Sequence, residues 1–329
     1  MTKLQSRIDL WDLLLAALLA ATFVLGAFST PSFLNAFNLS QLAAGAAEKA
    51  LLVLPMVLLI ISREIDLSVA SILALASVVL GLLVQAGAPL VIAVSLTILA
   101  GGALGAVNGA LVTRLSLPSL VVTLGTMALF RGIGYILIGT GSINVFPDEL
   151  MSFGVDELPG THIPFVVLPF LVLAPIFAIV LQLTPAGKRI YAIGGNPSAA
   201  LYSGVGVARL RFRLFIASGL VAALAGVVYT ARLNNARANN ALGMELDVIT
   251  IALLGGVSVW GGKGKLTGVV LALVLIATLR NLLGLNQVGG DAQGSVIGLL
   301  LIVSLLIGNA AEFLALVLRS SDAKARISG

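Results

Sequence analysis

The chain has 329 residues, of which 59% are hydrophobic and only 10% are charged, whereas soluble domains carry about 25% charged residues. This composition excludes a water-soluble globular protein. The absence of cysteine and the single histidine exclude disulfides, thiol catalysis and histidine-rich metal sites. The formal net charge is +5, but the basic residues lie between long apolar runs, where they indicate membrane orientation rather than nucleic-acid binding.

The apolar runs predict an all-α polytopic membrane protein with about ten transmembrane helices, in one domain over residues 1–329. The first run is interpreted as a retained span rather than a cleaved signal peptide, because Asp9 and Asp12 interrupt its start and further spans follow at once. Most runs have the roughly 20 residues that cross a ~30 Å hydrocarbon core. The predicted spans are 10–28, 42–61, 67–86, 89–112, 119–138, 164–183, 213–232, 248–260, 266–285 and 295–318.

The placement of lysine and arginine predicts that both termini lie in the cytoplasm of a bacterial inner membrane. With the N-terminus inside, the inner connections carry most of the basic residues. The long outer loop, residues 139–163, contains no lysine or arginine and has four acidic residues. The opposite orientation would reverse this bias, which the positive-inside rule disfavours.

Glu48 and Lys49 lie inside the second predicted span, and Arg131 lies inside the fifth. Charged groups at membrane depth are costly and face protein or water. Glu48 and Lys49 are sequence neighbours and do not share a helix face, so they are expected to seek partners on other spans. Structural pairing is favoured over substrate contact for each of the three. Close helix packing is predicted for the fourth span from its small residues, Gly101, Gly102, Gly105 and Gly109.

The connection Ser62–Ser71 places Arg63, Glu64 and Asp66 between two strong spans. It is either a tight charged turn at the membrane face or a segment that packs near the permeation path. Asp66 is expected to cap the following helix by accepting a backbone N–H of Ser68 or Val69. The path residues predicted in this segment are Asp66, Ser68 and Ser71.

A polar loop over residues 184–212 is predicted to lie in the cytoplasm and to contain a short helix. Asn196 is a good N-cap, Pro197 suits the first helical position, and Gly204 can end the helix. Such a helix either docks a partner protein or lies on the lipid headgroups, and the spacing alone does not separate these alternatives.

The eighth apolar run, 248–260, is too short to span and is interrupted by glycine. In transporters such a segment is typical of a broken or re-entrant helix that exposes backbone groups to a substrate. The alternative is a short tilted helix in a thin part of the membrane. The path residues predicted here are Gly255, Gly256, Ser258, Gly261 and Gly262.

The sequence contains no nucleotide-binding loop of the G-x-x-x-x-G-K-[ST] type. The three Gly-Lys pairs end at Lys188, Lys263 and Lys265, and the residue after each is Arg189, Gly264 or Leu266 rather than Ser or Thr. With no catalytic constellation either, the chain is expected not to be an enzyme by itself and to hold no cofactor. If transport is driven by ATP, the ATP and Mg²⁺ must bind a separate ATPase subunit.

Four segments together resemble the permeases of ribose-type sugar ABC importers, the branch that serves ribose, xylose, rhamnose and autoinducer-2. The segments are IDLSVAS (65–71), VVTLGTMALFRG (121–132), GKRIYAIGGNPSAALYSGV (187–205) and ELDVITIALLGGVSVWGGKGKLTG (245–268). They occur in the family's order, and the resemblance covers nearly the whole chain. In three places the sequence departs from the family's usual pattern: Arg63-Glu64 replaces two glycines, Ala70 replaces a glycine, and Lys265 stands where a small residue is common.

The resemblance implies a type II importer permease fold and a monosaccharide or similar polyol-like solute moved inward by alternating access. It implies three partners: a cytoplasmic ABC ATPase, a periplasmic solute-binding protein, and a second permease that is either an identical copy or a paralogue. It also implies that the 184–212 loop couples to the ATPase through Asn196, Pro197, Ser198, Ala199 and Ala200. The alternatives are an ABC permease for branched-chain amino acids or nucleosides, and an ion-driven secondary transporter using Glu48.

Overall fold

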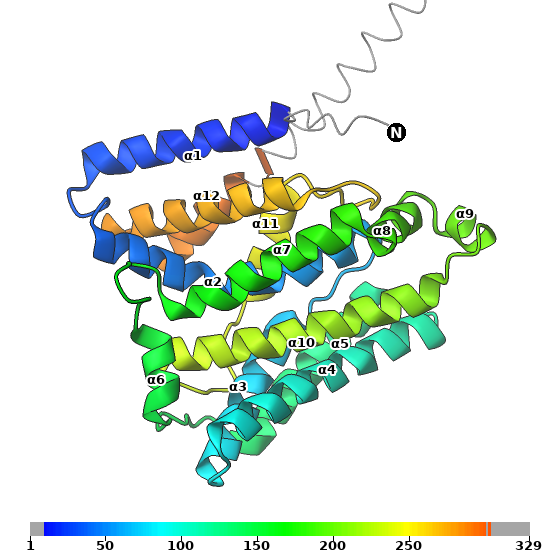
Figure 1. Ribbon diagram of the computed structural model, residues 1–329, viewed down its shortest axis with the longest axis horizontal. Coiled ribbons are helices and arrows are strands. Elements are labelled where there is room, and N and C mark those ends of the chain that lie inside the picture. The colour runs from blue at the N-terminus through cyan, green and yellow to red at the C-terminus, as the bar shows by residue number, and fades with distance from the viewer. Residues whose placement is uncertain (1–9, 301, 304–329) are drawn as a thin grey trace, which may run out of the picture. The chain divides into compact units, whose positions relative to one another are not determined.

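The computed structural model describes residues 10–300 and 302–303, and most of this part of the chain is helical (Figure 1). It contains no β-strands within those ranges, only isolated bridges such as the one between Ile143 and Ala236. The predicted all-α fold is therefore confirmed. The helices are α1 (Leu10–Ser29), α2 (Ala36–Ile61), α3 (Val69–Gln85), α4 (Leu90–Arg114), α5 (Ser119–Ile138), α6 (Asp148–Val155), the 3₁₀ turn η1 (Phe165–Val167), α7 (Leu168–Leu183), α8 (Pro185–Gly195), α9 (Pro197–Tyr202), α10 (Val207–Leu233), α11 (Met244–Leu254) and α12 (Leu266–Leu285).

Each of the first nine predicted spans corresponds to a helix, and the tenth begins in a helical stretch over residues 290–300. The remainder of the tenth, to residue 318, lies outside the described residues. Seven of the described helices are long and apolar enough to cross a membrane. Among the helices that match the first nine predicted spans, the two shorter ones are α3, with 17 residues, and α11, with 11. The count of ten spans is therefore approximate.

The chain divides into two compact units, residues 1–282 and residues 283–329. The second unit contains the last residues of α12 and the helical stretch 290–300. All contacts described below lie within the first unit.

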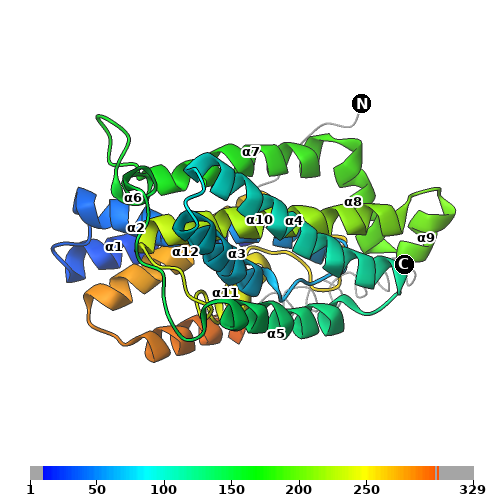
Figure 2. The same ribbon diagram turned by 90° about the horizontal axis from the view of Figure 1, so that it is seen from below.

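The core of the first unit is built around α10, which packs along α4 and also contacts α3 and α2 (Figures 1 and 2). A Cβ atom placed on Gly105 would clash with the backbone of Phe215 and Gly219, and one on Gly101 would clash with Gly219 and Ala223. The small residues of α4 therefore let two helix backbones approach closely, as predicted from the sequence.

Different helices of the first unit face different surroundings. Most side chains of α2 and α3 are buried, whereas α1 and α7 expose most of their apolar side chains. Exposed, uniformly apolar helices suit lipid contact, because hydrocarbon tails are as apolar as leucine. The polar and charged contacts of the molecule consequently concentrate between the buried helices and at the helix ends.

Figure 1 shows α6 and the α8–α9 corner at opposite ends of α10. Neither α6 nor α8 was expected from the sequence, which predicted loops there. Both begin at a proline-marked start: Pro147 precedes α6, and Thr184 caps α8 with Pro185 in its first turn. Both are short and their ranges are partly polar, so long apolar runs in the sequence do not predict them.

Candidate functional site

The predicted short helix in the 184–212 loop is present as α9, with the expected caps. The side chain of Asn196 accepts the N–H of Ala199 at 3.0 Å, which satisfies one of the free donors at the helix start. Pro197 occupies the first turn, and Gly204 follows the helix with φ 82°. The local signals in the sequence therefore fix both ends of this helix.

The side chains of α9 divide into an inner and an outer set. Ala200 is buried against the rest of the chain, so it supports the helix rather than projecting from it. Tyr202 is 91% exposed and Leu201 is 60% exposed, and Ser198 and Ala199 are also exposed. Two large apolar side chains exposed together on one turn suit docking to another protein better than contact with water.

Arg63 ties the connection between α2 and α3 to the end of α8. Its Nε donates to the carbonyl oxygen of Gly194 at 2.7 Å, and its Nη2 donates to that of Gly195 at 2.8 Å. These carbonyls belong to the last turn of α8, where helix C-termini lack intrahelical donors and favour positive charge. Arg63 itself has φ 66°, in the left-handed region that glycine adopts most easily. This conformation gives a physical reason for the first of the two glycines that Arg63-Glu64 replaces, since Glu64 does not have a positive φ.

The glycine-rich segment after α11 contacts both the end of α2 and the end of α8. The N–H of Gly262 donates to the carbonyl oxygen of Ile61 at 2.9 Å. A Cβ on Gly194 would clash with both Ile61 and Gly262, so three backbones pass within contact distance only because a glycine lies between them. We call this meeting of residues 61–63, 194–195 and 261–262 the three-segment junction.

Two further contacts brace the three-segment junction. The hydroxyl of Tyr191 donates to the carbonyl oxygen of Gly264 at 2.7 Å, and burial raises the pKa of Tyr191. Arg211 of α10 forms an ion pair with Glu64 at 2.9 Å and also donates to the carbonyl oxygen of Ser62. The α8–α9 corner, the glycine segment and α10 are thus all attached to the end of α2.

The α11 segment is broken as predicted: the helix ends at Leu254, and irregular backbone continues to Leu266. Gly255 is buried against Val269 of α12, whereas Gly256 is exposed beside Trp11. Ser258 is half-buried, and its backbone exchanges turn hydrogen bonds with Gly261 and Lys263. The glycines at 256, 261 and 262 all have positive φ, a requirement that larger residues meet only with strain.

Asp66, Ser68 and Ser71 belong to a different environment, a fully buried polar cluster. One carboxylate oxygen of Asp66 accepts the N–H and hydroxyl of Ser68 at 3.0 and 2.6 Å, and the other accepts the hydroxyl of Ser218 at 2.8 Å. Asn108 of α4 donates to the Ser68 hydroxyl at 2.7 Å. The expected hydrogen bond from the N–H of Ser68 is present, but Ser68 precedes α3 and has no side-chain cap, so Asp66 stabilises the turn before the helix rather than capping it. The cluster joins the start of α3 to α4 and α10.

The two predicted path segments therefore meet only in part. The connection after α2 touches the glycine segment through Ile61 and Arg63, whereas Asp66, Ser68 and Ser71 are turned into the interior. Sequence reasoning did not single out Ser218, Asn108, Tyr191 or Arg211, which complete these clusters. They come from helices far apart in the chain, so no local pattern marks them.

The charges within spans pair between helices, as expected. Glu48 pairs with Arg232 of α10 at 2.7 Å, while Lys49 pairs with Asp247 of α11 at 2.8 Å. Arg131 donates to the carbonyl oxygens of Ala238 and Asn240, in the loop that leads to α11. These contacts keep the charged groups away from lipid, at a smaller cost than isolated charges would carry.

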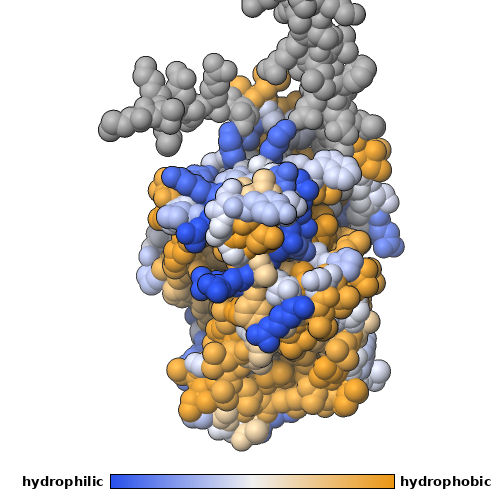
Figure 3. Space-filling view, turned by 90° about the vertical axis from the view of Figure 1, so that its right-hand side faces the viewer, coloured by the Kyte–Doolittle hydropathy of each residue, from blue (hydrophilic) through white to orange (hydrophobic). Residues whose placement is uncertain are grey.

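The two ends of α10 differ in charge. Basic side chains are exposed around α8 and the start of α10, and Figure 3 shows hydrophilic residues gathered over this end. Arg189, Arg209 and Arg213 line a pocket there, and no ion pair to them occurs among the described residues. At the opposite end, Ser40 of α2 donates to Glu157 of the 139–163 loop at 2.5 Å, and this hydrogen bond lowers the pKa of Glu157.

The polar contacts described above join separate helices to one another. Within the described part of the chain, no group of three or more acidic or histidine side chains is arranged to hold a metal ion. The structure contains a short exposed helix, a junction that links it to the irregular segment after α11, and paired charges between the buried helices.

Comparison with known proteins identifies the family to which this chain belongs. A family model described as "Branched-chain amino acid transport system / permease component" matches residues 38–305. The chain is 36% identical to the D-allose transport system permease protein of Escherichia coli (strain K12), over 90% of this chain and 91% of the relative. It is 35% identical to the ribose import permease protein of Bacillus subtilis (strain 168), with 84% and 86% covered.

A third relative, the autoinducer 2 import system permease protein of Yersinia enterocolitica (strain NCTC 13174 / 8081), is 32% identical, with 91% of both chains covered. No solved structure matches the chain. The family match covers most of the chain, and these relatives are aligned over nearly their whole length. The chain is therefore a multi-pass inner-membrane protein that belongs to the branched-chain amino acid transport system permease family, in the branch of ribose-type import permeases.

Proposed function

We propose that this permease is the membrane subunit of an ATP-binding-cassette importer and moves a monosaccharide or similar polyol-like solute into the cytoplasm by alternating access. The relatives' names support the solute class, since they specify allose, ribose and autoinducer 2. Branched-chain amino acids, named in the family description, are the alternative cargo. The ion-driven alternative loses its candidate site, because Glu48 is held in an ion pair with Arg232.

The observation that carries the proposal is the attachment of an exposed helix to a broken one. Tyr202 and Leu201 project from α9, and the three-segment junction connects the α8–α9 corner to the glycine segment after α11 by hydrogen bonds and backbone contact. A displacement of α9 can therefore be transmitted to the irregular backbone that follows α11. Since a ligand shifts a conformational equilibrium only through different interactions with the two states, ATP binding elsewhere must act through such a contact.

The proposal implies a specific assembly. An ATPase subunit binds ATP and Mg²⁺ and contacts Asn196, Pro197, Ser198 and Ala199, while Ala200 packs beneath them. A solute-binding protein delivers the solute at the opposite face, and a second permease, identical or paralogous, completes the path. The path is proposed to pass Asp66, Ser68 and Ser71 on one side and Gly255, Gly256, Ser258, Gly261 and Gly262 on the other, with both termini in the cytoplasm.

The test is uptake by the reconstituted complex. The permease, its ATPase and its binding protein are placed in proteoliposomes, and uptake of labelled D-ribose and D-allose is followed with and without ATP. We expect uptake that needs ATP and the binding protein and that persists when ion gradients are dissipated. Uptake driven by an ion gradient without ATP would contradict the mechanism, and uptake of leucine but neither sugar would contradict the solute class.

A further inference from the structure

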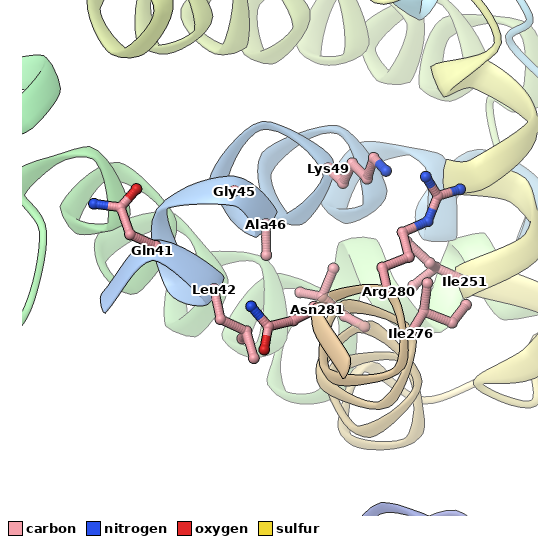
Figure 4. Close-up of a pocket in the computed structure, with 11 residues that line it drawn as sticks. Gln41, Leu42, Gly45, Ala46, Lys49, Ile251, Ile276, Arg280 and Asn281 are labelled. Carbon is pink, nitrogen blue, oxygen red and sulfur yellow. The ribbon is translucent and has the colours of Figure 1, made fainter. Parts of the chain in front are cut away.

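A cavity of about 220 Å³ lies between α2, α11 and α12 (Figure 4). Gln41, Gly45 and Lys49 line it from α2, Ile251 from α11, and Arg280 and Asn281 from α12. We call it the α2–α12 pocket. Its walls combine apolar side chains with a few polar groups, which is typical of small-molecule sites.

The charged groups of the pocket are mutually paired. Asp247 binds Lys49 at 2.8 Å and Arg280 at 2.7 Å, and Figure 4 shows Lys49 and Arg280 reaching toward the same space from two helices. Asn281 and Asn38 exchange hydrogen bonds at 2.8 and 2.9 Å. Gln41 is exposed and has no hydrogen-bond partner among the residues that the structure describes.

The pocket is unusual because its ion pairs, which join Asp247 to Lys49 and Arg280, lie deep in the membrane-spanning region. A 26-residue helix such as α2 is about 39 Å long at 1.5 Å per residue, and Lys49 lies near its middle. Charged side chains at that depth avoid lipid and mark binding sites or ion pathways by default. Transporters commonly hold their solutes near the bilayer midplane.

We propose that the α2–α12 pocket holds a small, uncharged, hydroxyl-rich solute on its way through the permease. Because Asp247 already neutralises one charge and engages both cations, Lys49 and Arg280 act as fixed hydrogen-bond donors. Amide side chains such as Gln41 both donate and accept, which matches hydroxyl groups that do the same. An anionic solute would instead compete with Asp247 for its partners.

The pocket also shares a helix, α11, with the start of the proposed path. Ile251 lines the pocket, and Gly255, one helical turn further along, begins the irregular segment that leads to the three-segment junction. The inference rests on the proposed function, because it assigns the binding position for that solute within the permease.

Gly45 allows the pocket to be filled without disturbing the fold. A Cβ placed on Gly45 meets no atom within 4 Å among the described residues, and helices favour larger residues over glycine. Gly45→Phe should therefore fold and occupy the cavity, while Gly45→Ala leaves most of it open and is the matched control. Gln41→Leu removes the unpaired amide at similar size.

The experiment uses the complete complex, with D-ribose and D-allose as probes. We expect Gly45→Phe to lower sugar uptake about tenfold or more, Gly45→Ala to lower it far less than Gly45→Phe does, and Gln41→Leu to raise the KM. Basal ATP hydrolysis and the elution volume of each complex verify assembly. Equal uptake by the Phe and Ala variants would overturn the pocket assignment alone, whereas no sugar uptake by the unaltered complex would overturn the proposed function as well.

A labelling experiment checks occupancy directly, since the chain has no native cysteine. We expect Gly45→Cys to react with a small polar thiol reagent and to react more slowly with D-ribose or D-allose present. If the sugar that is transported gives no protection, the solute does not occupy the pocket.

Discussion

Arg63 shows how a single side chain can offset an unfavourable backbone conformation. Its φ of 66° costs about 1 kcal/mol or more for a residue with a Cβ. Its guanidinium recovers energy by donating to the carbonyls of Gly194 and Gly195, each such bond being worth about 0.5–1.5 kcal/mol. The arginine thus adds a link between the α2 end and α8 that a glycine at this position would lack.

This balance predicts an order of stability for two variants. Arg63→Gly loses the hydrogen bonds but relieves the backbone, whereas Arg63→Ala loses the bonds and keeps the strain. We expect both variants to have a lower free energy of unfolding than the original protein. The value for the alanine variant should lie about 1 kcal/mol below that for the glycine variant. Thermal unfolding in detergent measures the order. An alanine variant as stable as the glycine variant would mean that the positive φ carries no cost.

The Asp66 cluster shows what a local pattern can and cannot predict. The contact to Ser68 lies two residues away and follows from the tendency of Asp side chains to accept a nearby backbone N–H. The contact to Ser218 joins residues 152 positions apart, and the sequence around Ser218 gives no sign of it. The same applies to Lys49, Asp247 and Arg280, whose pairing depends on how α2, α11 and α12 pack.

At the scale of elements, α9 and α11 were predictable because their signals are local. Asn196 and Pro197 mark the start of α9, and glycines mark the end of α11. Helix α8 has an equivalent start, with Thr184 before Pro185, yet it was assigned to a loop because its sequence is polar. A search for the cap and proline pair, rather than for apolar runs, would have found it.

The exposure of α9 predicts which of its residues binds the ATPase. Tyr202 is 91% exposed, and exposed aromatic residues often dominate an interface once it forms. We expect Tyr202→Asp to weaken ATPase association by about 2 kcal/mol, more than tenfold, in a pull-down or a titration with the purified subunit.

Tyr202→Phe is the matched control and should bind almost normally, because it keeps the apolar ring. Substitution of Ala200 would not separate docking from folding, since that side chain is buried within the permease. If the Asp variant binds the ATPase as tightly as the Phe variant, α9 is not the docking element.

At the scale of the whole molecule, the sequence predicted the fold class because membrane helices need long apolar runs whatever their packing. It left the arrangement around α10 open, because the apolar stripes of membrane helices do not distinguish lipid from protein. The small residues of α4 were the exception, since close helix approach requires them wherever the partner comes from.

The distribution of charge along α10 predicts the orientation of the chain in the membrane. The α8–α9 end carries exposed arginines and should lie in the cytoplasm, whereas the α6 end carries Asp148 and Glu149 and should lie outside. Ser152 of α6 and Ser198 of α9 are both exposed, and cysteine replaces serine with little change in size. In intact cells, we expect a membrane-impermeant maleimide to label Ser152→Cys at once and Ser198→Cys only after the membrane is opened. The cysteine-free parent chain gives the background. Labelling of Ser198→Cys but not Ser152→Cys in intact cells would invert the topology and, with it, the direction of transport proposed above.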